Sequence, residues 1–179
     1  MDNTLEETVP GEAAGPVQKR LVEFVLPMVI VGVDQATKAM VRASVPVHDS
    51  VTIIPGFLDI THALNSGAAF GILNGADFPF KTVIIAVIAT AALIGVGVYA
   101  ASLSHHQVVA RIGLALIIGG AAGNLIDRVL AGSVVDFVDV YWRTYHFWAF
   151  NVADSAISVG VTMLILDMLT TGPHVPKAV

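Results

Sequence analysis

Four long apolar segments constrain this chain more than any other feature of its sequence. The second of them contains no charged side chain, and its closely spaced alanines and glycines favour tight helix packing. The segments run over about 21–43, 82–103, 109–126 and 152–169. Because a helix needs about 20 apolar residues to cross the hydrocarbon of a bilayer, the pattern predicts an all-α membrane protein with four transmembrane helices.

The composition agrees with a chain that is covered partly by lipid. Only 13% of the residues are charged and 55% are hydrophobic, with a mean hydropathy of +0.78, whereas soluble domains carry about 25% charged residues. The chain has no cysteine, which excludes disulfides, a thiol nucleophile and lipidation of its own on cysteine. A net charge of -5 without a basic run argues against a nucleic-acid partner.

Two short tails flank the predicted membrane domain. Residues 1–18 are polar and acidic, with several prolines and glycines, and they predict a disordered tail. The membrane domain follows at 19–170, and residues 171–179 form a second tail. Four spans place both tails on the same side of the membrane.

The long loop at about 44–80 has the composition of a small β structure. It is rich in β-branched residues and is interrupted by Pro55 and Gly56. This pattern predicts two short strands, about 51–54 and 57–64, in a hairpin-like patch outside the membrane.

The polar side chains of the membrane segments collect at one end of the predicted bundle. Because successive spans run in opposite directions, the ends of the first and third spans and the start of the fourth share one membrane face. That face, with its loops, receives Asp34, Lys38, Asn65, Asn124, Asp127, Arg128, Asp136, Asp139, Asn151 and Asp154. Ionisable residues are costly in a membrane, so such a cluster usually marks a function.

Several of these residues also have a purely structural interpretation. Asp34 and Lys38 are four residues apart on a helix, and we expect them mainly to neutralise one another and brace the helix end. Asn124 and Arg128 can donate hydrogen bonds to peptide carbonyls or to lipid phosphate. The alternative for Arg128 is that it extends to the interface with Asp127 as its partner.

Asp136 and Asp154 are the candidate catalytic pair. Taken singly, Asp154 suits the N-terminus of a helix, and Asp136 could be a loop acid facing water. Both lie beside apolar residues on the same face, however. Amide hydrolysis without a metal needs one carboxylate to take a proton from water and another to protonate the carbonyl oxygen, and neighbouring carboxylates divide these roles. Competing centres are weaker, because the six histidines lack metal-ligand spacing and no G-x-S-x-G motif is present.

Five stretches, in this order, resemble the lipoprotein signal peptidases, the type II signal peptidases of bacteria. They are DQATK (34–38), NSGAAFGIL (65–73), GGAAGNLIDRV (119–129), VVDF (134–137) and FNVADSAI (150–157). The resemblance covers about residues 21–170. One departure is Trp148, which stands where a proline often precedes the Ala-Phe-Asn of the family's motif.

The resemblance implies an aspartyl endopeptidase of the bacterial inner membrane that removes the signal peptide from prolipoproteins, just before a cysteine carrying diacylglyceryl. Asp136 and Asp154 would be its catalytic dyad. The residues lining the substrate site would be Asn65, Asn124, Arg128 and Asn151, and those supporting it Asp34, Lys38, Gly67 and Asp127. The loop after the first span would form an extracytoplasmic β-cradle, with cytoplasmic termini and the active site at the outer face. We expect a monomer that contacts prolipoprotein and membrane lipid, without a metal, cofactor or nucleic acid.

Two other functions compete on the residues alone. An ion or proton transporter would use Asp34, Asp127 and Asp154 as a relay, but it would need acids at intermediate membrane depth. A non-enzymatic assembly factor would instead bind partners through the outer loop, and it would keep its function after mutation of the two candidate catalytic aspartates.

Overall fold

The structure is a computed structural model that describes residues 16–67, 72–76, 78–104 and 106–171. In this part of the chain the helices are α1 (Pro16–Ser44), α2 (Lys81–Ser102), α3 (Val108–Ala131) and α4 (Val152–Thr171). The strands are β1 (Ser50–Ile54), β2 (Leu58–Asn65), β3 (Val134–Trp142) and β4 (Tyr145–His146). Residues 1–15 and 172–179 of the predicted tails lie outside the described residues, whereas Pro16 already begins α1.

Four helices in the described ranges are long and apolar enough to cross a membrane, which confirms the predicted number of spans. The end of the third span was placed too early, because α3 continues beyond residue 126 to Ala131. Its last turns stay helical because their polar residues Asn124 and Asp127 are buried against other elements. The helix ends at Gly132, whose left-handed φ of 75° lets its N–H donate to the carbonyl oxygen of Arg128.

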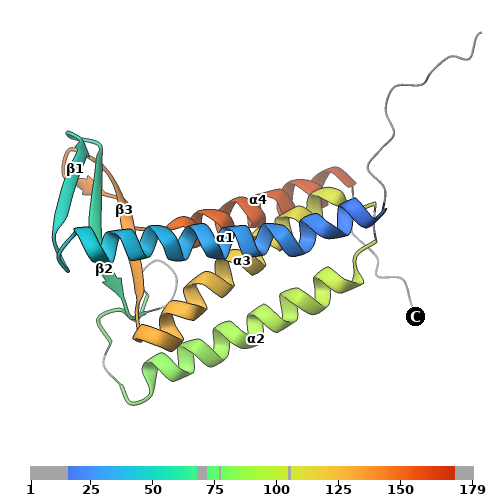
Figure 1. The fold of residues 1–179 in the computed structure, drawn as a ribbon, viewed down its shortest axis with the longest axis horizontal. Coiled ribbons are helices and arrows are strands. Elements are labelled where there is room, and N and C mark those ends of the chain that lie inside the picture. Colours follow the sequence, from blue (N-terminus) through green and yellow to red (C-terminus); the bar gives the residue numbers. More distant parts are fainter. Residues whose placement is uncertain (1–15, 68–71, 77, 105, 172–179) are drawn as a thin grey trace, which may run out of the picture.

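Helix α3 is the central helix of the bundle and packs against each of the other three (Figure 1). Its contact with α4 depends on glycine. A Cβ atom at Gly120 would lie 2.4 Å from the carbonyl oxygen of Ala153, and one at Gly113 would lie 2.8 Å from that of Gly160. Such close approach of backbones associates helices in lipid, where the hydrophobic effect does not drive them together.

Gly120→Ala is therefore expected to destabilise the folded protein by about 1–3 kcal/mol, the usual cost of inserting an extra carbon into a packed interface. Gly95→Ala is the matched control, because a Cβ atom at this α2 position meets nothing within 4 Å. Thermal unfolding in detergent, followed by circular dichroism, measures both changes. Equal melting temperatures for the two variants would contradict the packing described here.

The four strands of the described residues form an antiparallel sheet in the order β1-β2-β3-β4. In the first hairpin, Ser50 lies opposite Thr61 and Ile54 lies opposite Leu58. The two strands predicted from the loop after the first span are thus confirmed, with bounds that differ by one residue. A small β structure beside four spanning helices agrees with the predicted fold class.

The segment between the third and fourth spans differs most from its predicted structure. The sequence predicts a loop that carries Asp136 and Asp139, but residues 134–142 form β3, which pairs along β2 from Leu58↔Val140 to Asn65↔Val134. Its first four residues are all buried, so no alternation of polar and apolar positions marks it as a strand. Its partner β2 lies about 70 positions earlier in the chain, which a local pattern does not reveal.

The sheet lies at the end of the bundle where α1 and α3 finish and α4 begins (Figure 1). A buried cluster of Val41, Val45, Val135 and Phe137 fixes β3 against the last turns of α1. The sheet and the polar ends of three helices therefore meet at one junction.

Candidate active site

Asp136 and Asp154 lie on different elements that meet at this junction. Asp136 is the third residue of β3, and Asp154 lies in the first turn of α4. The side chain of Asp136 is buried between the sheet and the bundle, and Asp154 is half-buried. The alternative in which Asp136 is a loop acid that faces water is therefore wrong.

Asn151 contacts both carboxylates. Its side-chain amide donates to Oδ1 of Asp136 at 2.7 Å, and its backbone N–H donates to Oδ2 of Asp154 at 3.2 Å. The backbone N–H of Asp154 donates in return to Oδ1 of Asn151 at 2.9 Å. This reciprocal arrangement is a helix cap at the start of α4. One residue therefore fixes the start of the helix and holds the two acids close together.

Two more asparagines bind the remaining carboxylate oxygens. Asn124 of α3 donates to Oδ1 of Asp154 at 2.7 Å, and Asn65 at the end of β2 donates to Oδ2 of Asp136 at 3.0 Å. The carbonyl oxygen of the Asn124 side chain accepts from Asn151 at 3.1 Å. The structure therefore brings these three sequence-predicted site residues into contact with the two acids.

The protonation of Asp136 is set by its surroundings. Burial raises the pKa of the Asp136 carboxyl to about 7, and the negative charge of Asp154 adds to the rise. Hydrogen bonds from Asn65 and Asn151 act in the opposite direction, because they stabilise the carboxylate. Near neutral pH Asp136 is therefore able both to hold and to release a proton, as general acid–base chemistry with water requires.

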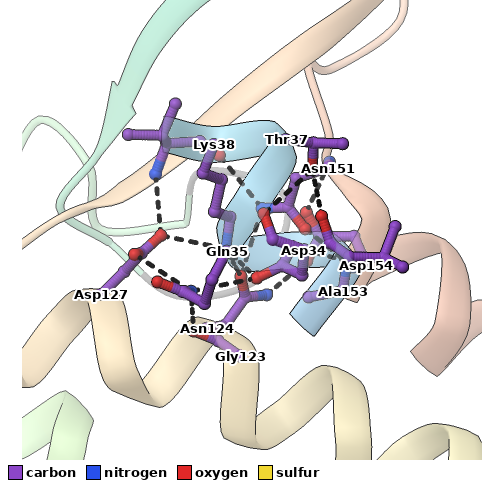
Figure 2. A network of polar contacts seen from close by, with 12 residues as sticks. Asp34, Gln35, Thr37, Lys38, Gly123, Asn124, Asp127, Asn151, Ala153 and Asp154 are labelled. Atoms are coloured by element: carbon purple, nitrogen blue, oxygen red, sulfur yellow. Dashed lines mark hydrogen bonds and ion pairs between the residues drawn. The ribbon is translucent and has the colours of Figure 1, made fainter. Parts of the chain in front are cut away.

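Lys38 is the centre of a buried ion-pair network that supports the site (Figure 2). Its Nζ lies 2.8 Å from Oδ2 of Asp34 and 2.9 Å from Oδ2 of Asp127, and the first contact confirms the predicted helical pair. Asp34 accepts from the backbone N–H of Ala153, and Asp127 accepts from that of Val135. These two backbone donors directly precede the two candidate acids in the chain. The network thus ties α1 and α3 to the segments that carry the acids.

Arg128 and Gly67 hold the chain that follows β2. The guanidinium of Arg128 donates to the carbonyl oxygens of Gly67 at 3.0 Å and Asn124 at 3.3 Å. The N–H of Gly67 donates to Oδ1 of Asn65 at 3.0 Å. A Cβ atom at Gly67 would lie 2.3 Å from the carbonyl oxygen of Ile72, so this position has no space for a side chain. Both residues therefore help to orient the asparagine that contacts Asp136.

Two members of the network are not among the residues predicted for the site. Arg42 pairs with Asp127 at 2.7 Å, and Gln35 donates to both acids of the network. Arg42 lies one helical turn after Lys38, so its spacing could have identified it, whereas Gln35 gives no comparable signal. Asp127 thus forms its ion pairs with Lys38 and Arg42, whereas the hydrogen bonds of Arg128 go to backbone carbonyl oxygens.

Asp139 is the one acid of the predicted cluster that the structure places elsewhere. It pairs with His146 of β4 at 2.8 Å, in the outer part of the sheet. Within the described ranges, no three His, Asp or Glu side chains are grouped so that they could hold a metal ion. What the site offers chemically is therefore a pair of neighbouring carboxyl groups surrounded by amide donors.

Known proteins with similar sequences and folds agree with one another. Residues 26–170 match the family model described as signal peptidase (SPase) II. A lipoprotein signal peptidase of Solibacter usitatus is 48% identical over 143 residues, which cover 78% of this chain and 85% of that protein. One of Pseudomonas putida is 40% identical over 163 residues, covering 89% and 93%. A solved bacterial membrane enzyme superposes with a TM-score of 0.75 at 34% identity, covering 88% of this chain and 94% of its own. This multi-pass membrane protein therefore belongs to the signal peptidase II family of aspartic endopeptidases.

Proposed function

We propose that this protein removes the signal peptide from prolipoproteins by cutting just before a cysteine that carries diacylglyceryl, with water activated by Asp136 and Asp154. Removal of signal peptides from prolipoproteins follows from the family. The single observation that supports the two-aspartate mechanism is that Asn151 donates a hydrogen bond to each carboxylate. In the proposed reaction, the water and the scissile peptide bond lie next to these two carboxyl groups.

The proposed reaction divides acid and base between the two carboxyl groups. The ionised group takes a proton from water, whose oxygen attacks the peptide carbon, while the protonated group gives its proton to the carbonyl oxygen. The resulting gem-diol intermediate breaks its C–N bond, and the leaving nitrogen takes up the proton that the base received. One hydroxyl of the diol returns its proton to the other aspartate as the carboxylic acid product forms, which restores the starting protonation of the pair. The raised pKa of Asp136 suits this exchange, because one proton is then shared by the pair near neutral pH.

The position of the site at the end of the spans suits a substrate that is anchored in the membrane. A signal peptide and its lipidated cysteine both lie in the bilayer, and the scissile bond between them lies near its surface. Because the lipoprotein precursor is exported, we propose that the site faces the outer side and that both termini are cytoplasmic. The asparagines and Arg128 are proposed to bind the peptide backbone around the cut.

Cleavage by the purified enzyme in lipid nanodiscs tests this proposal. The substrate is one prolipoprotein in two forms, with and without diacylglyceryl on its cysteine, and mass spectrometry locates the cut. We expect a single cut before the cysteine of the lipidated form, in the presence of a chelator as well. Equal cleavage of both forms, or a cut at another bond, would refute the proposed specificity.

The pH dependence of cleavage gives a second expectation. Because Asp136 loses its proton as the pH rises through about 7, kcat/KM is expected to fall on the alkaline side of that value. Asn65→Ala removes a hydrogen-bond donor that stabilises the Asp136 carboxylate. The substitution is therefore expected to raise the pKa of Asp136 further. The alkaline limb should then move upward by roughly one pH unit, since hydrogen bonds to charged groups contribute about 1.5 kcal/mol or more.

The control for this shift is Asn74→Ala. Asn74 accepts hydrogen bonds from Ser66 in the same stretch of chain, and its described contacts include neither acid. Its variant should therefore keep the alkaline limb of the wild-type enzyme, even where KM changes. A limb that stays in place in Asn65→Ala, or that moves equally in both variants, would contradict the assignment of this limb to Asp136.

A further inference from the structure

Both tryptophans of the chain lie within eight residues at the outer end of the sheet. The stretch 141–148 reads YWRTYHFW, and it covers the end of β3, all of β4 and the two residues after it. We call it the aromatic hairpin. Five of its eight side chains are those of tryptophan, tyrosine or phenylalanine. None of the five has a role in the cleavage reaction proposed above.

The aromatic side chains of this hairpin are largely uncovered. Tyr145 is 83% exposed, Trp142 68%, Trp148 63% and Phe147 55%. Large exposed apolar groups that lie together usually mark a surface that contacts another molecule. Exposed valine, isoleucine and phenylalanine side chains of the neighbouring β1–β2 hairpin extend the same kind of surface.

The aromatic hairpin is held in a defined shape. Trp142 pairs with Tyr145 across the turn, and the ring of Tyr141 stacks on that of His146 with centroids 4.8 Å apart. The backbone N–H of Tyr141 also donates to the carbonyl oxygen of Phe57 at 2.9 Å. This hydrogen bond joins the aromatic hairpin to the β1–β2 hairpin.

The chain limits how far this hairpin can lie from the membrane. The fourth span begins at Val152, four residues after Trp148, and four extended residues reach at most about 14 Å. The headgroup layer adds roughly 5–8 Å to each side of the hydrocarbon core. Figure 1 shows the turns of the sheet at the level where α1 ends, extending sideways past the bundle. Trp148 therefore lies within about 14 Å of the start of the fourth span, close enough for its ring to reach the headgroup layer.

We propose that the aromatic hairpin docks on the lipid headgroup region of the bilayer. Tryptophan and tyrosine prefer this layer because their rings are apolar on one side and carry an N–H or O–H group on the other. Arg143 at the turn supplies a cation for lipid phosphate. Lipid is the occupant favoured over a second protein because only residues 149–151 separate the aromatic hairpin from the start of the fourth span. The inference is independent of the proposed cleavage reaction.

Tryptophan fluorescence tests this docking directly, because the whole tryptophan signal comes from the aromatic hairpin. The full-length protein is placed in vesicles whose lipids carry a quencher either near the glycerol backbone or at the end of the acyl chain. Acrylamide serves as the aqueous quencher, and N-acetyltryptophanamide is the reference for full exposure. Trp142→Phe and Trp148→Phe separate the two signals while keeping an aromatic ring at each position.

For both tryptophans we expect strong quenching by the quencher near the glycerol backbone, weak quenching from the chain end, and acrylamide quenching at least threefold below the reference. Arg143→Glu should reduce the lipid quenching in vesicles of anionic lipid. Full acrylamide quenching without lipid quenching would overturn the proposal by placing the hairpin in water. Protection from acrylamide that depends on the ratio of protein to lipid, without lipid quenching, would also overturn it by indicating a protein partner.

Discussion

Asp136→Asn and Asp154→Asn are each expected to lower kcat/KM for prolipoprotein cleavage by roughly 10³-fold or more, the range of a lost acid–base group. Asparagine has nearly the shape of aspartate, but it neither takes a proton from water nor donates one as a carboxylic acid. The proposed mechanism uses the two groups as one unit. The double variant should therefore be no slower than the single variants within about tenfold, because residues that act together are not additive.

Asp139→Asn is the control for these variants. It is the same substitution on the same strand, three residues after Asp136, but its carboxylate pairs with His146 away from the site. Its activity should stay within about threefold of wild type, and all the variants should insert and purify alike. Retained cleavage in either Asp136→Asn or Asp154→Asn would disprove the two-aspartate mechanism while leaving the family membership intact.

Lys38→Met is expected to cause the largest loss of stability among single substitutions in the support network. Lys38 is fully buried, and its removal leaves the buried Asp34 without its cation, whereas Asp127 keeps only Arg42. Breaking a buried ion pair from one side costs about 3–5 kcal/mol, because the remaining charge has lost its partner. Thermal unfolding in detergent micelles, with the fraction of monodisperse protein, measures this loss.

The double variant Lys38→Met with Asp34→Asn distinguishes a charge effect from a packing effect. It restores neutrality, because Asp127 keeps its ion pair with Arg42. The double variant should thus be clearly more stable than Lys38→Met alone, by a coupling free energy above about 1 kcal/mol. If the double variant lost as much stability relative to wild type as Lys38→Met and Asp34→Asn lose separately and added together, the electrostatic account of the network would be wrong.

The spans and the polar cluster were predictable because both depend on local composition. A segment without charge and long enough to cross the hydrocarbon has few folded states other than a spanning helix. Once the spans alternate, the residues at their ends share a face, and Asn124, Asn151 and Asp154 are brought together by topology alone. The same reasoning found the pair of Asp34 and Lys38, since a four-residue spacing faces one side of a helix.

The strand β3 was not predictable in this way. Its start is buried on both sides, so the alternation that reveals a half-buried strand is absent. Whether such a run becomes a strand depends on β2, which supplies the partner group, N–H or carbonyl, of each backbone hydrogen bond between the two strands. Asp136 gains its buried position, and with it a pKa of about 7, from this pairing.

The sequence by itself determined that the chain spans a membrane four times and that its acids gather at one end, because hydrocarbon excludes charge and leaves the polar residues at the helix ends. Only the tertiary structure decided which acids lie together. In the folded protein, Asn151 donates a hydrogen bond to both Asp136 and Asp154. Asp127 forms ion pairs with Lys38 and Arg42, and Asp139 pairs with His146 in the outer part of the sheet. These partnerships depend on hydrogen bonds a few ångströms long between elements far apart in the chain, and such contacts form only when the sheet and helices have packed.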